Sequence, residues 1–321
     1  MTSKPAETAG VNAQTAALLE LFESQGAKQF ENIGLLRTRR VIGLSVGLQG
    51  DRVSVSGVQD LLIDGPDGRI PVRIYRPVID AGRGVLIVYL HGGGWATGSV
   101  DVADGPARML AAATGVMIAS VEYRLAPETP FPGPLEDCYA AVQWLAARAE
   151  SLGIDPSRIV ILGDSAGANL AAATALLTRQ RGGHPIAHQV LLYPCLFPAK
   201  SSPFDSYREN AVGYSMTAAT MEWFWSLYLR QESDGQNPLA APLREADLAD
   251  LPTATLVTAE FDPLRDEGRE YAARLTAAGV DTELLEYAGT IHGFFWMAGH
   301  LEQAGHVASA IGAALDRRFP D

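Results

Sequence analysis

Gly163-Asp164-Ser165-Ala166-Gly167 is the stretch of sequence that decides the fold, because it joins an apolar run to a series of small residues. Residues 158–162 predict a buried strand, and residues 166–177 predict a tightly packed helix. A serine at a sharp turn between a strand and a helix projects its hydroxyl above the sheet, and flanking glycines tolerate the strained backbone. Ser165 is therefore the candidate nucleophile. The pattern alone is weak in a chain with 32 glycines, so its surroundings must support it.

The composition is that of an ordinary globular protein. Of the 321 residues, 47% are hydrophobic and 19% are charged, which excludes wholesale disorder and allows a large core. The net charge of -12 argues against binding to nucleic acid or to an anionic membrane surface, because both would repel the chain. We therefore expect a small, neutral or weakly charged molecule as the partner.

Two features bear on the cellular compartment. The first ten residues lack the charged start and apolar core of a secretory signal, and the apolar run 41–48 is too short to span a bilayer, so we expect a cytoplasmic protein. Cys138 and Cys195 could form a disulfide, but a large chain without a secretion signal more often keeps two buried free thiols.

From about residue 59, strand-like apolar runs alternate with helical patterns, which predicts a sheet with helices on both faces. Residues 59–64 and 69–76, separated by Gly65-Pro66-Asp67-Gly68, predict an antiparallel hairpin. The other predicted strands are 84–90, 116–121, 158–162, 188–193, 253–258 and 282–287. The sequence thus indicates an α/β protein with a mostly parallel, eight-stranded sheet.

Two stretches do not fit this alternation. Residues 12–24 predict a helix outside the sheet, with Asn12 as its cap. Residues 204–230 are unusually rich in aromatic and methionine side chains. These side chains either pack a long connection into the core or form a cap that walls an apolar substrate pocket.

A serine hydroxyl becomes a good nucleophile only when a base removes its proton. His292 is the best candidate base, because it directly follows the last predicted strand, where a loop at the carboxyl edge of the sheet can reach Ser165. Four other histidines fit surface or packing positions: His184, His188, His300 and His306.

A buried carboxylate must orient the histidine, and Asp262 follows the seventh predicted strand at the same edge. Glu260 competes with it, whereas Asp266 and Glu267 more naturally begin the next helix, where acidic side chains favour the positive end of the dipole. The order serine, aspartate, histidine is the one expected of α/β-hydrolases.

An oxyanion also needs hydrogen-bond donors, and His91-Gly92-Gly93-Gly94-Trp95 directly follows the third predicted strand. We expect the amides of Gly92, Gly93 and Ala166 to form a three-donor oxyanion hole. The competing interpretation is an ordinary glycine-rich turn. His91 is expected to be structural, and Trp95 either lines the pocket or packs beneath it.

These motifs together resemble the hormone-sensitive lipase family, also called the bacterial family IV esterases. Residues 123–128 (Y-R-L-A-P-E), 262–267 (D-P-L-R-D-E) and 292–294 (H-G-F) match further segments of that family. The resemblance implies an α/β-hydrolase fold with a helical cap formed by residues 1–50 and by an insertion at about 200–232, on a catalytic domain spanning 51–321. Asp164 is characteristic of the family and is expected to make local hydrogen bonds. Ala168 departs from the family, where many members have a glycine.

The resemblance further implies a serine carboxylesterase that hydrolyses short- to medium-chain acyl esters through an acyl-enzyme, without metal or cofactor. We expect six aromatic residues to line the substrate site: Trp95, Tyr193, Phe204, Tyr214, Trp223 and Phe294. Amidase, lactonase or deacetylase activity with the same residues stays open. A non-catalytic receptor is disfavoured because His292 is present, whereas the gibberellin receptors that resemble this family lack the histidine. The family's pairing through the edge strand and C-terminal helix allows a homodimer.

Overall fold

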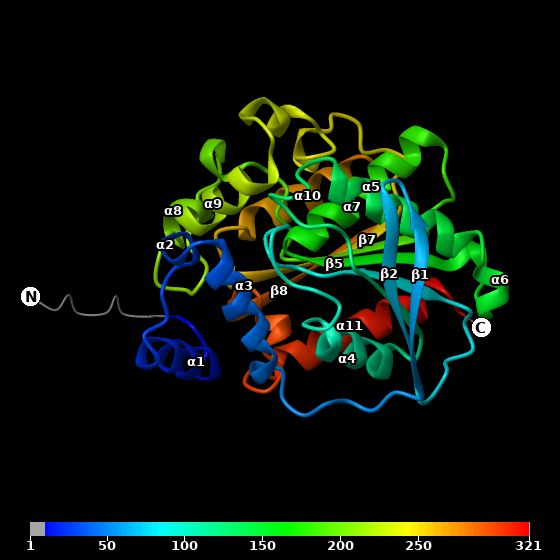
Figure 1. The fold of residues 1–321 in the computed structure, drawn as a ribbon, viewed down its shortest axis with the longest axis horizontal. Helices are drawn as coiled ribbons and strands as arrows, with labels where there is room; N and C mark the ends of the chain where they lie inside the picture. Colours follow the sequence, from blue (N-terminus) through cyan, green and yellow to red (C-terminus); the bar gives the residue numbers. More distant parts are fainter. Residues whose placement is uncertain (1–9, 321) are drawn as a thin grey trace, which may run out of the picture.

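A single eight-stranded sheet, in the order β1-β2-β4-β3-β5-β6-β7-β8, forms the centre of the molecule (Figure 1). The computed structural model describes residues 10–320, so the first nine residues of the predicted segment 1–50 lie outside it. The strands are β1 (Gly57–Gly65), β2 (Gly68–Arg76), β3 (Leu86–Leu90), β4 (Met117–Val121), β5 (Ile159–Asp164), β6 (His188–Leu192), β7 (Thr253–Phe261) and β8 (Thr282–Ile291).

The pairing of the strands confirms the mostly parallel sheet. The pairs β1/β2 and β2/β4 are antiparallel, and every pair from β4/β3 to β7/β8 is parallel. The predicted hairpin is present, with Gly65 opposite Gly68 at its turn. Strands β7 and β8 run several residues further than predicted, with a register irregularity near Ala259. These extensions carry the chain directly to Asp262 and His292 at the carboxyl edge.

Helices cover both faces of the sheet (Figure 1). Helices α4 (Asp104–Thr114) and α11 (Gln303–Arg318) lie on one face, and α5 (Gly133–Ala146), α7 (Ala166–Arg181) and α10 (Arg265–Ala277) lie on the other. Each face has its own cluster of buried apolar side chains. The shorter elements are α6 (Ala149–Leu152), η1 (Ser45–Leu48), η2 (Pro156–Arg158), η3 (Ala199–Ser201), η4 (Glu232–Gln236), η5 (Pro242–Arg244) and η6 (Phe294–Trp296).

The two stretches that break the alternation meet outside the sheet. Residues 12–48, here the N-terminal segment, contain α1 (Ala13–Ser24), α2 (Phe30–Ile33) and α3 (Leu35–Leu44). Residues 199–237, here the insertion segment, contain α8 (Ser206–Glu209) and α9 (Ala218–Tyr228). In Figure 1, α2 lies beside α9, and the rings of Phe30 and Phe224 meet edge to face at 6.1 Å between centroids. The side chain of Asn12 accepts a hydrogen bond from the amide of Thr15 at 2.8 Å, as predicted for the cap of α1.

Two further predictions can be checked on the described chain. Cys138 and Cys195 are both buried and free, so the thiol interpretation is confirmed over the disulfide. Among the helices of residues 10–320, none combines the length and the apolar character needed to cross a bilayer.

Candidate active site

Ser165 occupies a strained turn between β5 and α7. Its φ of 56° and ψ of -120° are unfavourable for a residue with a side chain, and only 7% of it is exposed. The turn requires glycine on both sides of Ser165, because there is no space for a side chain at either position. A Cβ on Gly163 would overlap the Gly167 backbone, and a Cβ on Gly167 would overlap the carbonyl of Leu90. The amide of Ser165 donates to Leu192 O at 2.9 Å, which fixes the turn against β6.

The structure brings His292 and Asp262 to Ser165 in a continuous hydrogen-bonded series. His292 Nε2 lies 2.9 Å from Ser165 Oγ, and His292 Nδ1 lies 2.7 Å from Asp262 Oδ2. The other carboxylate oxygen of Asp262 accepts the amide of Leu264 at 2.9 Å, and the side chain is fully buried. In this geometry the imidazole can take the serine proton while the carboxylate orients the ring and stabilises its charged form.

The competing acids and the other buried histidines are engaged elsewhere. Glu260 accepts the amide of Gly289 at 2.8 Å, while Asp266 and Glu267 lie in the first turn of α10. Both ring nitrogens of His188 contact threonine hydroxyls on β7, and burial lowers its pKa to about 3. Burial likewise lowers the pKa of His91 to about 4, which suits a structural, neutral ring.

Asp164 is bound to the glycine loop, and this corrects the expected role of Gly92. The amide of Gly92 donates to Asp164 Oδ1 at 3.0 Å, and the hydroxyl of Tyr89 donates to the same oxygen at 2.8 Å. Because its hydrogen is already used, the Gly92 amide does not serve as an oxyanion donor. Burial raises the pKa of Asp164 to about 6. Its position shows the local hydrogen bonding that the sequence suggested.

The next two glycines carry the unused amides. Within residues 10–320, the amides of Gly93, Gly94 and Ala166 have no hydrogen-bond acceptor. The φ angles of Gly93 and Gly94 are 123° and 59°, where a side chain is disfavoured, and a Cβ on Gly94 would overlap the ring of Phe224. These amides and that of Ala166, next to the nucleophile, are suited to receive an oxyanion.

Three of the expected substrate-site residues are packing residues instead. Trp95 is fully buried, stacks on Tyr228 at 4.3 Å and donates its ring N–H to Asn169 at 3.3 Å. Tyr193 is 1% exposed and lies edge-on to His292 at 4.9 Å, and Phe294 is fully buried against Tyr193. Each ring is enclosed by neighbours, so we correct their assignment as pocket-lining residues.

The other three aromatic residues lie at partly exposed positions in the insertion segment. Phe204, Tyr214 and Trp223 are half-buried and contact Phe197, Phe261 and Phe224, respectively. The sequence did not single out Phe224 among them. Its ring covers Gly94, and only the surplus of aromatic residues in 204–230 hinted at such a contact.

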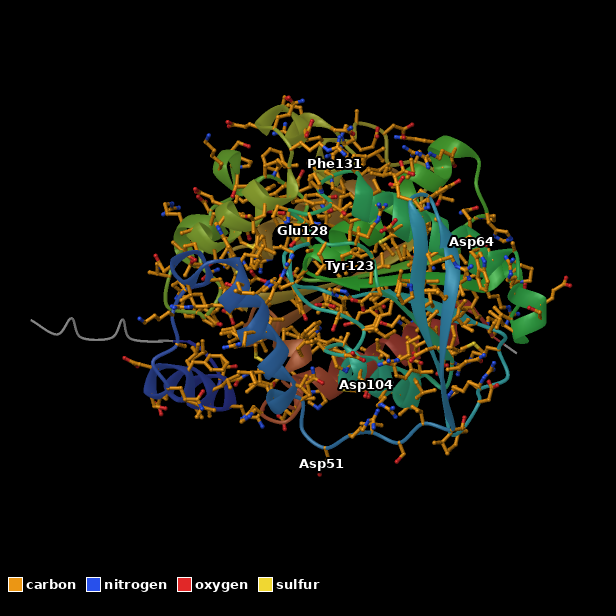
Figure 2. The ribbon with its side chains drawn as sticks, viewed as in Figure 1. Asp51, Asp64, Asp104, Tyr123, Glu128 and Phe131 are labelled. Atoms are coloured by element: carbon orange, nitrogen blue, oxygen red, sulfur yellow. The ribbon has the colours of Figure 1, made fainter. Side chains whose placement is uncertain are left out.

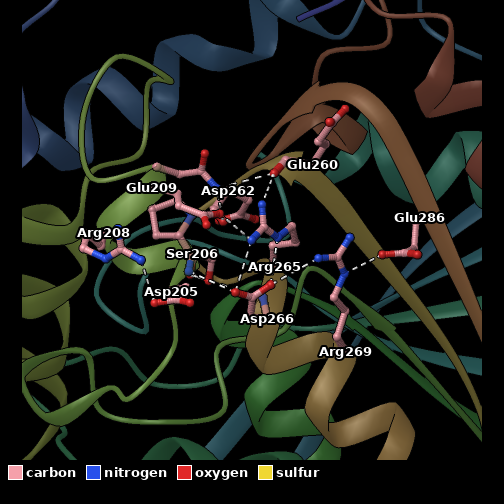
Figure 3. Close-up of polar contacts among 12 residues, drawn as sticks. Asp205, Ser206, Arg208, Glu209, Glu260, Asp262, Arg265, Asp266, Arg269 and Glu286 are labelled. Carbon is pink, nitrogen blue, oxygen red and sulfur yellow. Dashed lines mark hydrogen bonds and ion pairs between the residues drawn. The ribbon is translucent and has the colours of Figure 1, made fainter. Parts of the chain in front are cut away.

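The insertion segment is also joined to the loop that carries Asp262 (Figure 3). Ser206 Oγ donates to Pro263 O at 2.6 Å, and Asn210 Nδ2 donates to Asp262 O at 3.0 Å. Asp266 accepts the amide of Ser206 at 2.9 Å, and Arg265 bridges Asp266 and Glu209. Helix α8 and the residue that follows it are therefore hydrogen-bonded to the loop that carries Asp262.

Glu267 makes a second, fully buried connection. Its Oε2 accepts the amides of Leu196 and Phe197, which directly precede the insertion segment, the second at 2.9 Å. Its Oε1 lies 2.8 Å from the hydroxyl of Tyr207 on α8. Burial is the main cause that raises the pKa of Glu267 to about 8, with Asp262 adding repulsion.

Comparisons with known proteins agree on one family. A family model described as alpha/beta hydrolase fold matches residues 87–296. Esterase LipI of Mycobacterium tuberculosis is 42% identical over 246 residues, which cover 75% of this chain and 76% of that protein. An arylesterase of Saccharolobus solfataricus is 38% identical over 267 residues, covering 83% of this chain and 85% of the relative.

Solved structures show the same likeness. A thermostable esterase from Pseudomonas putida superposes with a TM-score of 0.92 at 30% identity, covering 98% of this chain and 100% of the other. An α/β hydrolase from the metagenome of Lake Arreo gives a TM-score of 0.91 at 35% identity, with coverage of 97% and 99%. The chain therefore belongs to the α/β-hydrolase fold family, among its carboxylesterases that resemble hormone-sensitive lipase.

Proposed function

We propose that this carboxylesterase acts through Ser165 as nucleophile, His292 as base and Asp262 as orienting acid. The observation that carries the proposal is the unbroken series from Ser165 Oγ through the imidazole to the buried Asp262 carboxylate, at 2.9 Å and 2.7 Å. Three residues that lie far apart in the sequence meet at hydrogen-bonding distance, which a purely structural histidine would not require.

The reaction follows from this geometry. Ser165 Oγ attacks the ester carbonyl while His292 Nε2 takes its proton, and the carbonyl oxygen becomes an anion held by the amides of Gly93, Gly94 and Ala166. Protonated His292 then donates to the leaving alcohol as the C–O bond breaks. Water next attacks the acyl-enzyme with His292 as base, which releases the acid and restores Ser165.

Exchange of the nucleophile tests this assignment. Ser165→Ala should reduce the hydrolysis of p-nitrophenyl butyrate by at least about 10³-fold, because the remaining groups cannot replace the attacking oxygen. Ser309→Ala, at an exposed serine of α11, is the matched control and should keep wild-type turnover. A Ser165→Ala enzyme that is folded and as active as the control would disprove the role of Ser165.

We further propose that the N-terminal and insertion segments together form the cap, and that the substrates are short- to medium-chain esters. Support comes from the contact of α2 with α9 and from Phe224, which is 2% exposed and covers Gly94, one of the proposed oxyanion donors. Small substrates also agree with the relatives, which include an ethyl acetate hydrolase of Pseudomonas putida and the arylesterase of Saccharolobus solfataricus. Turnover of p-nitrophenyl esters should therefore peak at short or medium acyl chains; a maximum at palmitate would contradict this.

Amide, lactone and deacetylation substrates are the alternatives that share this chemistry. We expect the ester of a matched ester, amide and lactone series to turn over fastest, because an alkoxide leaves more easily than an amine. Faster turnover of the amide would favour an amidase instead. Homodimerisation and a cytoplasmic location stay predictions, and light scattering of the purified protein tests the first.

A further inference from the structure

Arg39 on α3 hydrogen-bonds the N-terminal segment to the end of the glycine loop. Its Nε donates to Ala96 O at 2.8 Å, and its Nη2 donates to Ala126 O at 3.1 Å. Both terminal nitrogens also bind the carboxylate of Glu128, at 2.7 Å and 2.6 Å. Figure 2 shows Glu128 near the N-terminal helices. One guanidinium thus joins three parts of the chain.

The loop that Arg39 contacts has a backbone that needs outside support. Gly93, Gly94 and Trp95 are three successive residues with positive φ, and for Trp95 this value of 58° is strained. Inside the loop, Gly93 O accepts the amides of Ala96 and Thr97. The tryptophan side chain fixes the loop from beneath, in the core. Arg39 binds the loop from the N-terminal segment, at the carbonyl of Ala96, two residues after Gly94.

The segment around Ala126 completes the support. The amide of Ala126 donates to Trp95 O at 2.9 Å, while its carbonyl accepts from Arg39. The guanidinium therefore bridges two backbone segments that already contact each other. Arginine is suited to this because its planar fork offers five donors in fixed directions, whereas lysine offers a single ammonium that cannot reach both carbonyls and the carboxylate in the same plane.

We propose that Arg39 is a positioning residue for the oxyanion hole, holding the amides of Gly93 and Gly94 where the developing anion needs them. This rests on the proposed function, because it assumes that these amides bind the oxyanion. The ion pair itself contributes little, since 62% of the Glu128 side chain is exposed and solvent screens it. The contacts to the two carbonyls carry the effect.

Steady-state kinetics with p-nitrophenyl butyrate test the proposal, together with inhibition by a boronic acid, which forms a tetrahedral adduct on the serine. Removal of one oxyanion donor typically costs about 10² to 10³ in kcat, so displacement of the loop by Arg39→Ala should cost about tenfold, with little change in KM. The inhibition constant of the boronic acid should rise by a similar factor.

Three variants separate position from charge and folding. Arg39→Lys should lose nearly as much kcat as Arg39→Ala, because it keeps the charge and loses the fork. Glu128→Gln should lose less, because the carbonyl contacts stay. Arg37→Ala is the matched control, because Arg37 is exposed on the same helix and, within the described residues, has no ion-pair partner. The Arg37→Ala enzyme should have the kcat of wild type.

The proposal would be overturned if folded Arg39→Lys kept the kcat and the boronic acid inhibition constant of wild type. It would also be overturned if Glu128→Gln lost as much kcat as Arg39→Lys. If Arg39→Ala fails to fold by circular dichroism, the lysine and glutamine variants still decide. Failure of the proposed function would give another result: Ser165→Ala would then still hydrolyse the ester, independently of the results for the Arg39 variants.

Discussion

The charge of Glu267 should make stability depend on pH in a direction opposite to that of most carboxylates. Burial raises its pKa in the folded protein from the ordinary 4.5 to about 8. Between these values the unfolded chain releases a proton that the folded chain keeps, so stability falls as pH rises. At about 1.4 kcal/mol per pKa unit, the full effect is about 5 kcal/mol, present below the lower pKa and lost as pH passes the upper one.

The contacts of Glu267 show how to remove this dependence without removing its hydrogen bonds. Two amides donate to Oε2, so the proton must lie on Oε1, where it can be donated to the hydroxyl of Tyr207. Glutamine reproduces that arrangement, because its carbonyl accepts the two amides and its NH₂ donates to the tyrosine. Glu267→Gln should therefore fold normally and lack the titration.

Urea unfolding of both proteins across the pH range measures the effect. The free energy of unfolding of Glu267→Gln, relative to wild type, should rise by about 4 kcal/mol between about pH 5 and about pH 8. Asp164, whose pKa is also raised, titrates in both proteins and cancels in the difference. A difference that stays constant over this range would refute the reasoning, because it would mean that Glu267 is ionised in the folded protein throughout.

Three further substitutions test other contacts. Asp262→Asn should lower kcat by about 10⁴, as the same change does in a serine protease triad, and a loss below tenfold in folded enzyme would contradict its role. Gly94→Ala should lower the free energy of unfolding by about 1–2 kcal/mol and reduce kcat, because the new methyl group meets Phe224 at a left-handed φ; Gly305→Ala, whose added Cβ meets nothing within 4 Å, is the control. Asn210→Ala should lower the free energy of unfolding in urea by about 0.5–1.5 kcal/mol, because it removes one of the two hydrogen bonds that the Asp262 carbonyl accepts and leaves the one from the Arg265 amide; an unchanged midpoint would contradict a contribution of that bond.

The sheet was predictable because its strands are local patterns. Buried parallel strands appear as continuous apolar runs, and the turn Gly65-Pro66-Asp67-Gly68 marks the hairpin. Candidate residues at strand ends followed from the same logic, since parallel strands share one carboxyl edge. Ser165, Asp262 and His292 meet there because the chain returns three times to that edge.

Contacts between distant segments could not be predicted in this way. No local pattern shows that Asp164 accepts the amide of Gly92, so the expected donors were shifted by one glycine from those that are unused. Trp95 and Tyr193 have the same aromatic character as pocket-lining residues, and only their surroundings reveal that they are enclosed. Arg39 and Glu128 are 89 residues apart, and charge alone does not indicate which arginine pairs.

The separation of Ser165 and His292 by 127 residues makes catalysis a reporter of complete folding. The histidine follows the last strand of the sheet, so a ribosome-bound chain that has not yet released β8 carries the nucleophile and no base. Hydrolysis of a chromogenic ester during synthesis would therefore mark the moment at which the final strand docks. If the chain were divided into two fragments before β8, neither fragment alone should hydrolyse the ester, and activity should appear only when the two fragments reassemble.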